Sequence, residues 1–229
     1  MKTSILIVLC LFIIANAGFC QKNDEVADID QLIKAENFKE ANRLITSRLT
    51  VFFNTKNVDT IGDYINYLGK TVNKISGTAA AKQDVLAVVQ KAKKAFPYHK
   101  ALVPIYLEAS FFISNQGDNE LAYKLVSELD SYFATQPSII DADLSAIQSN
   151  MGDFAMRLGR NAQATGHYLK SIEYLKRNPK PDAQKLYFGN NSLGIVIAQF
   201  AGSLLSRNFR GICRFSRYLY HFNNKHTCR

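Results

Sequence analysis

Four alanines recur along the chain at nearly constant spacing, and no other feature limits the possible folds as strongly. They are Ala41, Ala81, Ala122 and Ala164, separated by 40, 41 and 42 residues. Each is followed four residues later by a larger apolar or aromatic residue, which places both side chains on one face of a helix. A repeat of this length is typical of stacked helix pairs, because a single pair cannot bury its own apolar face.

The segment from Ser149 to Tyr174 shows the repeat most clearly, as two helices joined by a turn at Gly159. Small and aromatic residues recur at helical spacing in the two helices: Met151, Gly152, Ala155, Ala164, Tyr168 and Ser171. This order resembles the tetratricopeptide repeat, a helix-turn-helix unit, although Asn161 stands where that family has an aromatic residue. Leu68-Gly69 and Leu193-Gly194 repeat the same pattern, so the resemblance extends over roughly Asp28 to Phe200.

The resemblance implies an all-α fold, a right-handed α-solenoid of antiparallel helix pairs with about four to five units, the first and last degenerate. We expect a signal peptide over residues 1–20, a flexible leader over 21–28, the repeat domain over 29–203 and a basic aromatic tail over 204–229. Hydrophobic periodicity predicts helices at 29–34, 38–49, 60–75, 79–95, 104–114 and 120–134, and a fourth pair from Asp141 to Arg177. Pro97 ends one helix, Pro104 lies in the first turn of the next, and residues 54–59 form a polar connector.

The net charge of +9 is concentrated at the C-terminal end. From Ser203 onward there are six basic residues and no acidic one, so the rest of the chain carries about +3. A nearly balanced body does not indicate a nucleic-acid partner. Three interpretations of the tail remain open: a poorly ordered or frame-shifted segment, a helix that caps the last repeat, or an aromatic and basic arm that contacts a membrane or a nucleic acid.

Residues 1–20 have the pattern of an export signal. Lys2 precedes an apolar run from Ile5 to Ala15, and small residues suit cleavage near Ala17 or Cys20. Phe19 stands immediately before Cys20, where a lipoprotein signal requires a small residue, so we expect no lipidation. The protein is therefore expected to be periplasmic or secreted, and stabilised by helix packing because the repeat region contains no cysteine.

The residues needed for catalysis or for metal binding do not form a known pattern. His99 follows a Pro-Tyr sequence at the end of a helix, and His167 precedes Tyr168; neither belongs to a nucleophile motif. Cys213, His221, His226 and Cys228 have ligand-type side chains, but their spacing does not match a zinc site. We therefore expect no enzyme activity, no cofactor and no metal.

In the tetratricopeptide family, the first helix of each unit lines a concave groove. The resemblance carries this role to three sets of positions: Asn66, Lys70, Asn73 and Lys74; Leu107, Phe111, Ser114 and Asn115; Ser149, Asp153, Met156 and Arg157. The first set is rich in hydrogen-bond donors and suits an extended acidic peptide or a C-terminal carboxylate. The register of the second set is weaker, because Ser110 replaces the glycine. Solvated polar positions without a ligand are the alternative interpretation.

The sequence thus predicts an exported, non-catalytic scaffold that binds protein or peptide segments. The spacing of 42 and the proline-containing linker at Pro179 and Pro181 also resemble the repeats that precede caspase-like CHAT protease domains in bacteria. A first alternative is therefore the truncated N-terminal repeat region of a larger CHAT-type protease or signalling protein. A second alternative is a membrane-surface protein that acts through the tail.

Overall fold

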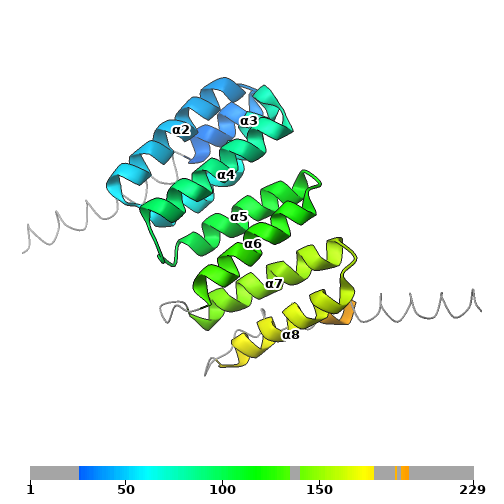
Figure 1. Cartoon of the computed structure of the whole chain (residues 1–229). Coiled ribbons are helices and arrows are strands. Elements are labelled where there is room, and N and C mark those ends of the chain that lie inside the picture. The colour runs from blue at the N-terminus through cyan, green and yellow to red at the C-terminus, as the bar shows by residue number, and fades with distance from the viewer. Residues whose placement is uncertain (1–25, 135–139, 178–188, 190–191, 196–229) are drawn as a thin grey trace, which may run out of the picture. The chain divides into compact units, whose positions relative to one another are not determined.

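The computed structural model describes residues 26–134, 140–177, 189 and 192–195, and every regular element within these ranges is a helix (Figure 1). The predicted signal peptide and the basic tail lie outside the described residues. The chain divides into two compact units, one ending at Gln116 and the other beginning at Gly117. The boundary falls inside the third predicted helix pair, after its first helix.

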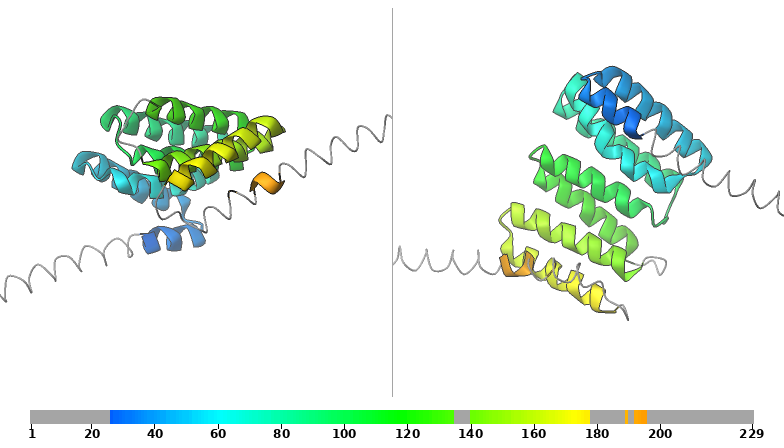
Figure 2. Two further views of the ribbon diagram at one scale, coloured as in Figure 1. Left: turned by 90° about the horizontal axis from the view of Figure 1, so that it is seen from below. Right: turned by 180° about the vertical axis from the view of Figure 1, so that it is seen from behind.

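The N-terminal unit contains five helices among its described residues, together with one turn of 3-10 helix. Residues 26–34 form the short first helix, shown in dark blue in Figure 2. The remaining elements are α2 (Phe38–Thr55), η1 (Val58–Thr60), α3 (Ile61–Ser76), α4 (Thr78–Ala95) and α5 (Leu102–Asn115). Helix α3 packs against α2, α4 and α5, and therefore lies at the centre of this unit.

The C-terminal unit consists of α6 (Asn119–Phe133), α7 (Asp141–Arg157) and α8 (Asn161–Arg177), with further helical residues at 192–195. Helix α7 packs against both α6 and α8. The turn between α7 and α8 contains Gly159, whose φ of +72° is a conformation that glycine adopts without strain. The side chain of Asp118 caps α6 by accepting a hydrogen bond from the Leu121 amide.

The four repeated alanines occupy equivalent places in four helices. Each is the fourth residue of its helix, and its amide donates a hydrogen bond to the carbonyl four residues earlier, at Asn37, Gly77, Asp118 or Arg160. All four alanines are fully buried. So are the partners four residues later, Ile45, Val85, Val126 and Tyr168. The predicted register is therefore confirmed at all four repeats, since a small buried side chain lies in the first turn of each of these helices.

Two boundaries differ from the prediction in the first helix pair. The first helix already includes residues 26–28, which the sequence placed in the leader; Ile29 is buried and anchors this segment. Helix α2 continues to Thr55 instead of ending at Leu49. Phe52, three residues beyond Leu49, lies on the same face and is also buried, so burial of that aromatic ring extends the helix into the predicted connector.

The other helix boundaries agree with the sequence to within two residues. Helix α4 ends at Ala95, two residues before Pro97, and Pro104 lies in the first turn of α5. Ser76 and Gly77 join α3 to α4, and Gly77 has a φ of +86°. Among the described helices, none combines the length and the apolar composition required to cross a bilayer.

Candidate functional site

The first predicted set of groove residues lies along one side of α3. Asn66, Lys70, Asn73 and Lys74 are separated by four, three and one residue, and they project away from the buried contacts of Leu68 and Val72. Both lysines are exposed and both asparagines are half-buried. The amphipathic pattern of α3 therefore orients these side chains, because its apolar face is already covered by neighbouring helices.

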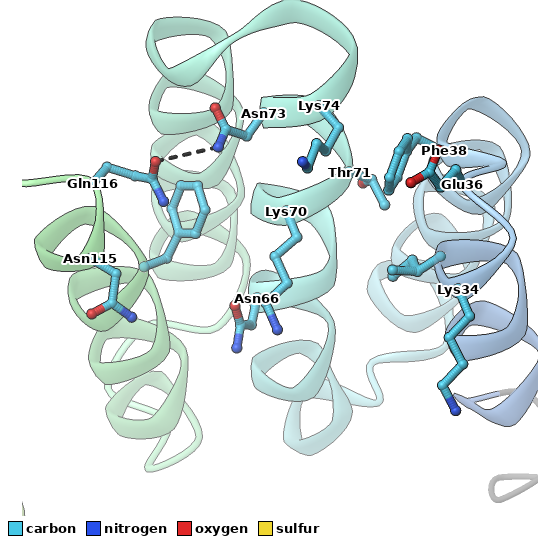
Figure 3. A pocket seen from close by; sticks show the side chains of 12 residues that line it. Lys34, Glu36, Phe38, Asn66, Lys70, Thr71, Asn73, Lys74, Asn115 and Gln116 are labelled. Atoms are coloured by element: carbon cyan, nitrogen blue, oxygen red, sulfur yellow. Dashed lines mark hydrogen bonds between the residues drawn. The ribbon is translucent and has the colours of Figure 1, made fainter.

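A pocket of about 350 Å³ opens over this side of α3, and we call it the α3 pocket (Figure 3). Its walls come from the first helix and the start of α2, from α3, and from the end of α5. The lining residues are Ile33, Lys34, Glu36, Phe38, Asn66, Lys70, Thr71, Asn73, Lys74, Phe112, Asn115 and Gln116. The pocket thus combines residues from three consecutive helix pairs, all within the N-terminal unit.

Hydrogen bonds fix part of the pocket wall. The Asn73 amide donates to Gln116 Oε1 at 3.3 Å, which joins α3 to the end of α5 (Figure 3). Asn73 Oδ1 in turn accepts from the Thr78 hydroxyl at 2.9 Å. Asn73 is therefore held in one orientation by its neighbours, whereas Lys70 and Lys74 are long, flexible donors at the surface.

The charge of the α3 pocket is positive. Lys34, Lys70 and Lys74 line it together with one carboxylate, that of Glu36. The Lys74 ammonium lies 6.0 Å from the centre of the Phe38 ring, a distance at the outer limit of a cation–π contact. Within the part of the chain that the structure describes, none of the three lysines forms an ion pair. A carboxylate ligand could therefore pair with these ammonium groups, because they are not already in ion pairs with carboxylates of the protein.

Of the second predicted set, only Asn115 lines the α3 pocket. Leu107 and Phe111 are half-buried and lie outside it, and Ser114 is 4% exposed, so its side chain faces the core. The prediction for Ser114 as a groove residue is therefore wrong. Phe112 lines the pocket instead, and its ring packs over Gly69 on α3.

The third predicted set lies on α7 and belongs to a different pocket. Ser149 and Asp153 line a cavity of about 420 Å³ between α7, α8 and residues 189 and 192, which we call the α7 cavity. Met156 instead packs against the buried cluster of Ala155, Ala164 and Tyr168. Arg157 is exposed and lies close enough to Asp153 to favour its ionised form. The predicted residues of the two units thus line separate pockets, and their role in binding stays a prediction.

Several polar side chains at the α7 cavity form hydrogen bonds with groups on the neighbouring helix. The Tyr168 hydroxyl donates to Asp153 Oδ1 at 2.5 Å, and the hydroxyls of Ser145 and Ser171 lie 2.9 Å apart. Burial raises the pKa of Asp153, against the opposing effects of the Tyr168 hydrogen bond and of Arg157. Burial and the adjacent carboxylate also raise the pKa of Tyr168. These groups partner each other across α7 and α8, an arrangement that joins the helices.

His167 belongs to a network of hydrogen bonds between α6, α7 and α8. Its Nδ1 lies 2.8 Å from Gln148 Oε1, and its Nε2 lies 3.0 Å from the Tyr123 hydroxyl. Gln148 donates through Nε2 to Asp130 at 2.8 Å, so its Oε1 accepts the proton on His167 Nδ1. Tyr123 therefore donates to Nε2. The imidazole is fully engaged in joining three helices, and the other candidate, His99, is an exposed loop residue.

Sequence reasoning missed several residues of the α3 pocket. Those that it did not select include Lys34, Glu36, Phe38, Thr71, Phe112 and Gln116. A signal for Lys34 was present: the spacing of 40 that relates Ala41 to Ala81 also relates Lys34 to Lys74. Lys34 ends the short first helix, and the degenerate form of that unit concealed the correspondence.

No group of three or more His, Cys, Asp or Glu side chains suited to a metal ion occurs in the described ranges. The cysteines and histidines of the tail, from Cys213 to Cys228, lie outside them. No protein-family model matches the sequence. No curated protein matches it either.

Solved structures are similar in fold. A crystal structure of a protein from Podosopora anserina, described as a kinesin light chain with nearly identical TPR-like repeats, matches with a TM-score of 0.55 and 13% identity, over 85% of this chain and 96% of that one. BtubC (BKLC) from P. vanneervenii matches with a TM-score of 0.54 and 14% identity, over 88% of this chain and 80% of that one. The resemblance to repeats that precede CHAT domains stays a prediction. At these identities the likeness concerns the fold alone, and the chain has the all-α solenoid fold of tetratricopeptide-like repeat proteins.

Proposed function

We propose that this protein is an exported, non-catalytic scaffold that binds an extended acidic peptide segment in the α3 pocket. The observation that carries the proposal is the set of lysines around the pocket, Lys34, Lys70 and Lys74, which the described chain leaves without ion-pair partners. Ammonium groups of this kind bind carboxylates through charge-assisted hydrogen bonds. The tetratricopeptide-like fold supports this function, since solenoids present extended surfaces to their ligands.

The walls of the pocket suit a peptide better than a small ion. Phe38 and Phe112 provide apolar surface, and the amide groups of Asn66 and Asn115 can pair with a peptide backbone. Asn73 and Gln116 hold each other, so this wall of the pocket is formed before any ligand arrives. A preformed site loses less conformational entropy on binding.

Binding of short, fluorescently labelled, glutamate-rich peptides to the full chain tests the proposal. We expect the double variant Lys70→Ala, Lys74→Ala to weaken binding by about fivefold or more, and the loss to shrink at high salt. The matched control is Lys94→Ala with Lys100→Ala, which removes the same charge from exposed positions outside the pocket. Equal losses in the two double variants would show that net charge alone drives the interaction, and would overturn the proposed site.

Export is proposed from the N-terminal sequence, which lies outside the described residues. Expression of the full chain in a bacterial host, followed by N-terminal sequencing of the protein from the periplasm and the medium, tests it. We expect a new N-terminus close to Ala17 or Cys20. Recovery of the chain only in the cytoplasm, with residues 1–20 still attached, would contradict export.

A further inference from the structure

The α7 cavity has a polar lining on α7 and α8, and all of its described lining residues belong to the C-terminal unit. On α7, Ser145, Ser149 and Asp153 follow one another at intervals of four residues, and Asn150 stands three residues before Asp153. Among the described residues that line the cavity, Asp153 is ionisable and none is basic. This lining therefore offers hydroxyl, amide and carboxyl groups without a positive charge.

One acceptor at this cavity has no partner in the protein. Asn150 is 9% exposed, and its amide nitrogen donates to the carbonyl oxygen of Ala146 at 2.8 Å. That bond identifies the oxygen of the amide, because the reversed amide would place two acceptors against each other. Among the buried side-chain nitrogen and oxygen atoms of the described residues, Asn150 Oδ1 alone lacks a hydrogen bond.

A donor from a ligand would satisfy this acceptor. A buried acceptor without a donor costs free energy, which a hydrogen bond from a ligand recovers. The torsion about the Cβ–Cγ bond of asparagine has a broad minimum, so the oxygen of Asn150 can turn toward a donor in the cavity without leaving its rotamer.

A carboxyl group lies one helical turn from this acceptor. Side chains three residues apart on a helix, as Asn150 and Asp153 are, have Cβ atoms about 5–6 Å from each other. Asp153 Oδ1 accepts from the Tyr168 hydroxyl, and the exposed Arg157 favours the ionised carboxylate. Burial outweighs both in raising the pKa of Asp153, so its negative charge is poorly solvated. A carboxylate accepts about four hydrogen bonds, and the bond from Tyr168 leaves room for others.

We propose that the α7 cavity binds a primary alkylammonium group, which donates hydrogen bonds to Asn150 Oδ1 and to the Asp153 carboxylate. An ammonium nitrogen carries three N–H donors and no acceptor, so it suits two neighbouring acceptors of which one is charged. The volume of about 420 Å³ accommodates a short aliphatic chain beside Ala146 and Leu175. A lysine side chain and a free small amine share this chemistry. The site is separate from the α3 pocket, and the proposal does not depend on peptide binding there.

Ligand-observed NMR titration of the full chain with n-butylammonium tests the proposal. Two probes of similar size are the controls: 1-butanol has a donor and no charge, and tetramethylammonium has the charge and no N–H donor. We expect n-butylammonium to bind about fivefold or more tightly than either control. A blocked peptide with one lysine among glycines distinguishes the two sources of the amine. Affinity equal to or above that of n-butylammonium supports a lysine side chain as the ligand, and lower affinity supports a free amine.

Two variants locate the binding site. Asn150→Leu removes the acceptor and keeps the size of the side chain, and Asp153→Asn removes the charge; each should weaken binding of n-butylammonium by about fivefold or more. The matched controls are Gln163→Leu and Glu173→Gln, which make the same kinds of change at exposed positions of α8 outside the cavity and should leave binding unchanged. Circular dichroism checks that each variant is folded.

Three results would overturn the proposal. One is equal binding of n-butylammonium and the two control probes, and another is binding that both Asn150→Leu and Asp153→Asn leave unchanged. The third is the absence of saturable binding, which would show that water alone satisfies Asn150. The proposed function of the α3 pocket would stand in all three cases.

Discussion

The ring of Tyr168 on α8 lies directly over Gly152 on α7, with ring carbons as close as 2.7 Å to the position that a Cβ atom on Gly152 would occupy. Tyr168 is fully buried, and its hydroxyl donates to Asp153, the next residue along α7. The absence of a side chain at Gly152 therefore allows the two helices to approach, and the hydrogen bond fixes the ring in that place.

We expect Gly152→Ala to destabilise the protein by about 1–3 kcal/mol, because the added methyl group overlaps the Tyr168 ring. The overlap outweighs the gain of up to about 1 kcal/mol that alanine normally brings to a helix. The matched control is Gly166→Ala on α8, where an added Cβ meets nothing within 4 Å. That variant should be neutral or stabilising. Chemical denaturation followed by circular dichroism measures both, and a stabilised Gly152→Ala would refute the close contact.

Substitutions at Asp153 should separate its charge from its hydrogen bond. We expect Asp153→Ala to lower the free energy of unfolding by about 1–3 kcal/mol at about pH 7, because it leaves the buried Tyr168 hydroxyl without an acceptor. Asp153→Asn retains an acceptor oxygen and should cost less than the alanine variant. Urea denaturation measures both, and equal losses would show that the hydrogen bond does not depend on an oxygen at this position.

The pKa of Asp153 is raised by burial, so the folded protein holds this proton more tightly than the unfolded chain. The corresponding stability is present at low pH and is lost as the pH rises from about 3.8 through the folded pKa. Denaturation curves across this range should show a flatter pH dependence for Asp153→Asn than for the parent protein. If the free energy of unfolding depends on pH equally in the two proteins, burial does not raise the pKa of the Asp153 carboxyl.

Protonation of His167 should weaken the fold. Burial lowers its pKa from 6.5, Lys170 adds to that effect, and Asp130 opposes it. The unfolded chain therefore takes up the proton first, and the free energy of unfolding should fall as the pH drops below about 6.5. In His167→Gln this part of the pH dependence should disappear. His99→Gln changes an exposed histidine and should leave this pH dependence intact. If the pH dependence were lost in His99→Gln and kept in His167→Gln, its assignment to His167 would be wrong.

The repeated alanines should not tolerate enlargement. We expect Ala81→Leu to destabilise the N-terminal unit by about 1–3 kcal/mol, because the alanine is fully buried at the start of α4 and a larger side chain would overpack the core. Ala79→Leu, two residues earlier in the same helix, changes an exposed position and should have little effect. Thermal unfolding of the two variants makes the comparison. Similar melting temperatures for both would mean that the alanine register does not reflect close packing.

The sequence predicted the helices well because local patterns determine them. Spacing of apolar residues, glycines at turns and prolines near helix ends all act within a few residues, and they placed α3 to α8 to within two residues. The end of α2 was less accurate. Its last turn depends on the burial of Phe52, whose ring packs edge-on against the ring of Tyr64 with 5.0 Å between the two ring centres. A contact between different helices gives no signal in the local sequence.

The candidate site was predicted in part. Asn66, Lys70, Asn73 and Lys74 follow a strong register around Gly69 and lie together at the α3 pocket. Ser114 stands four residues after Ser110, as Asn73 stands four residues after Gly69, but its side chain is buried, and the position within the repeat did not predict that difference. Ser149 and Asp153 line the α7 cavity instead, and Asp153 accepts a hydrogen bond from Tyr168 on α8. The position of a residue within its repeat does not specify which neighbouring helix packs over that residue.

By itself the sequence determined that this chain forms a series of helices, with an alanine near the start of each second helix directed into the core, since helical periodicity and side-chain size are properties of the chain alone. Only the tertiary structure decided which charged groups meet. Lys34 on the first helix and Lys70 on α3 line the same pocket, and Asp63 on α3 lies close enough to Glu108 on α5 to raise the pKa of its carboxyl. These contacts depend on how the helices pack, because electrostatic and packing interactions act through space and cannot be read from the local sequence.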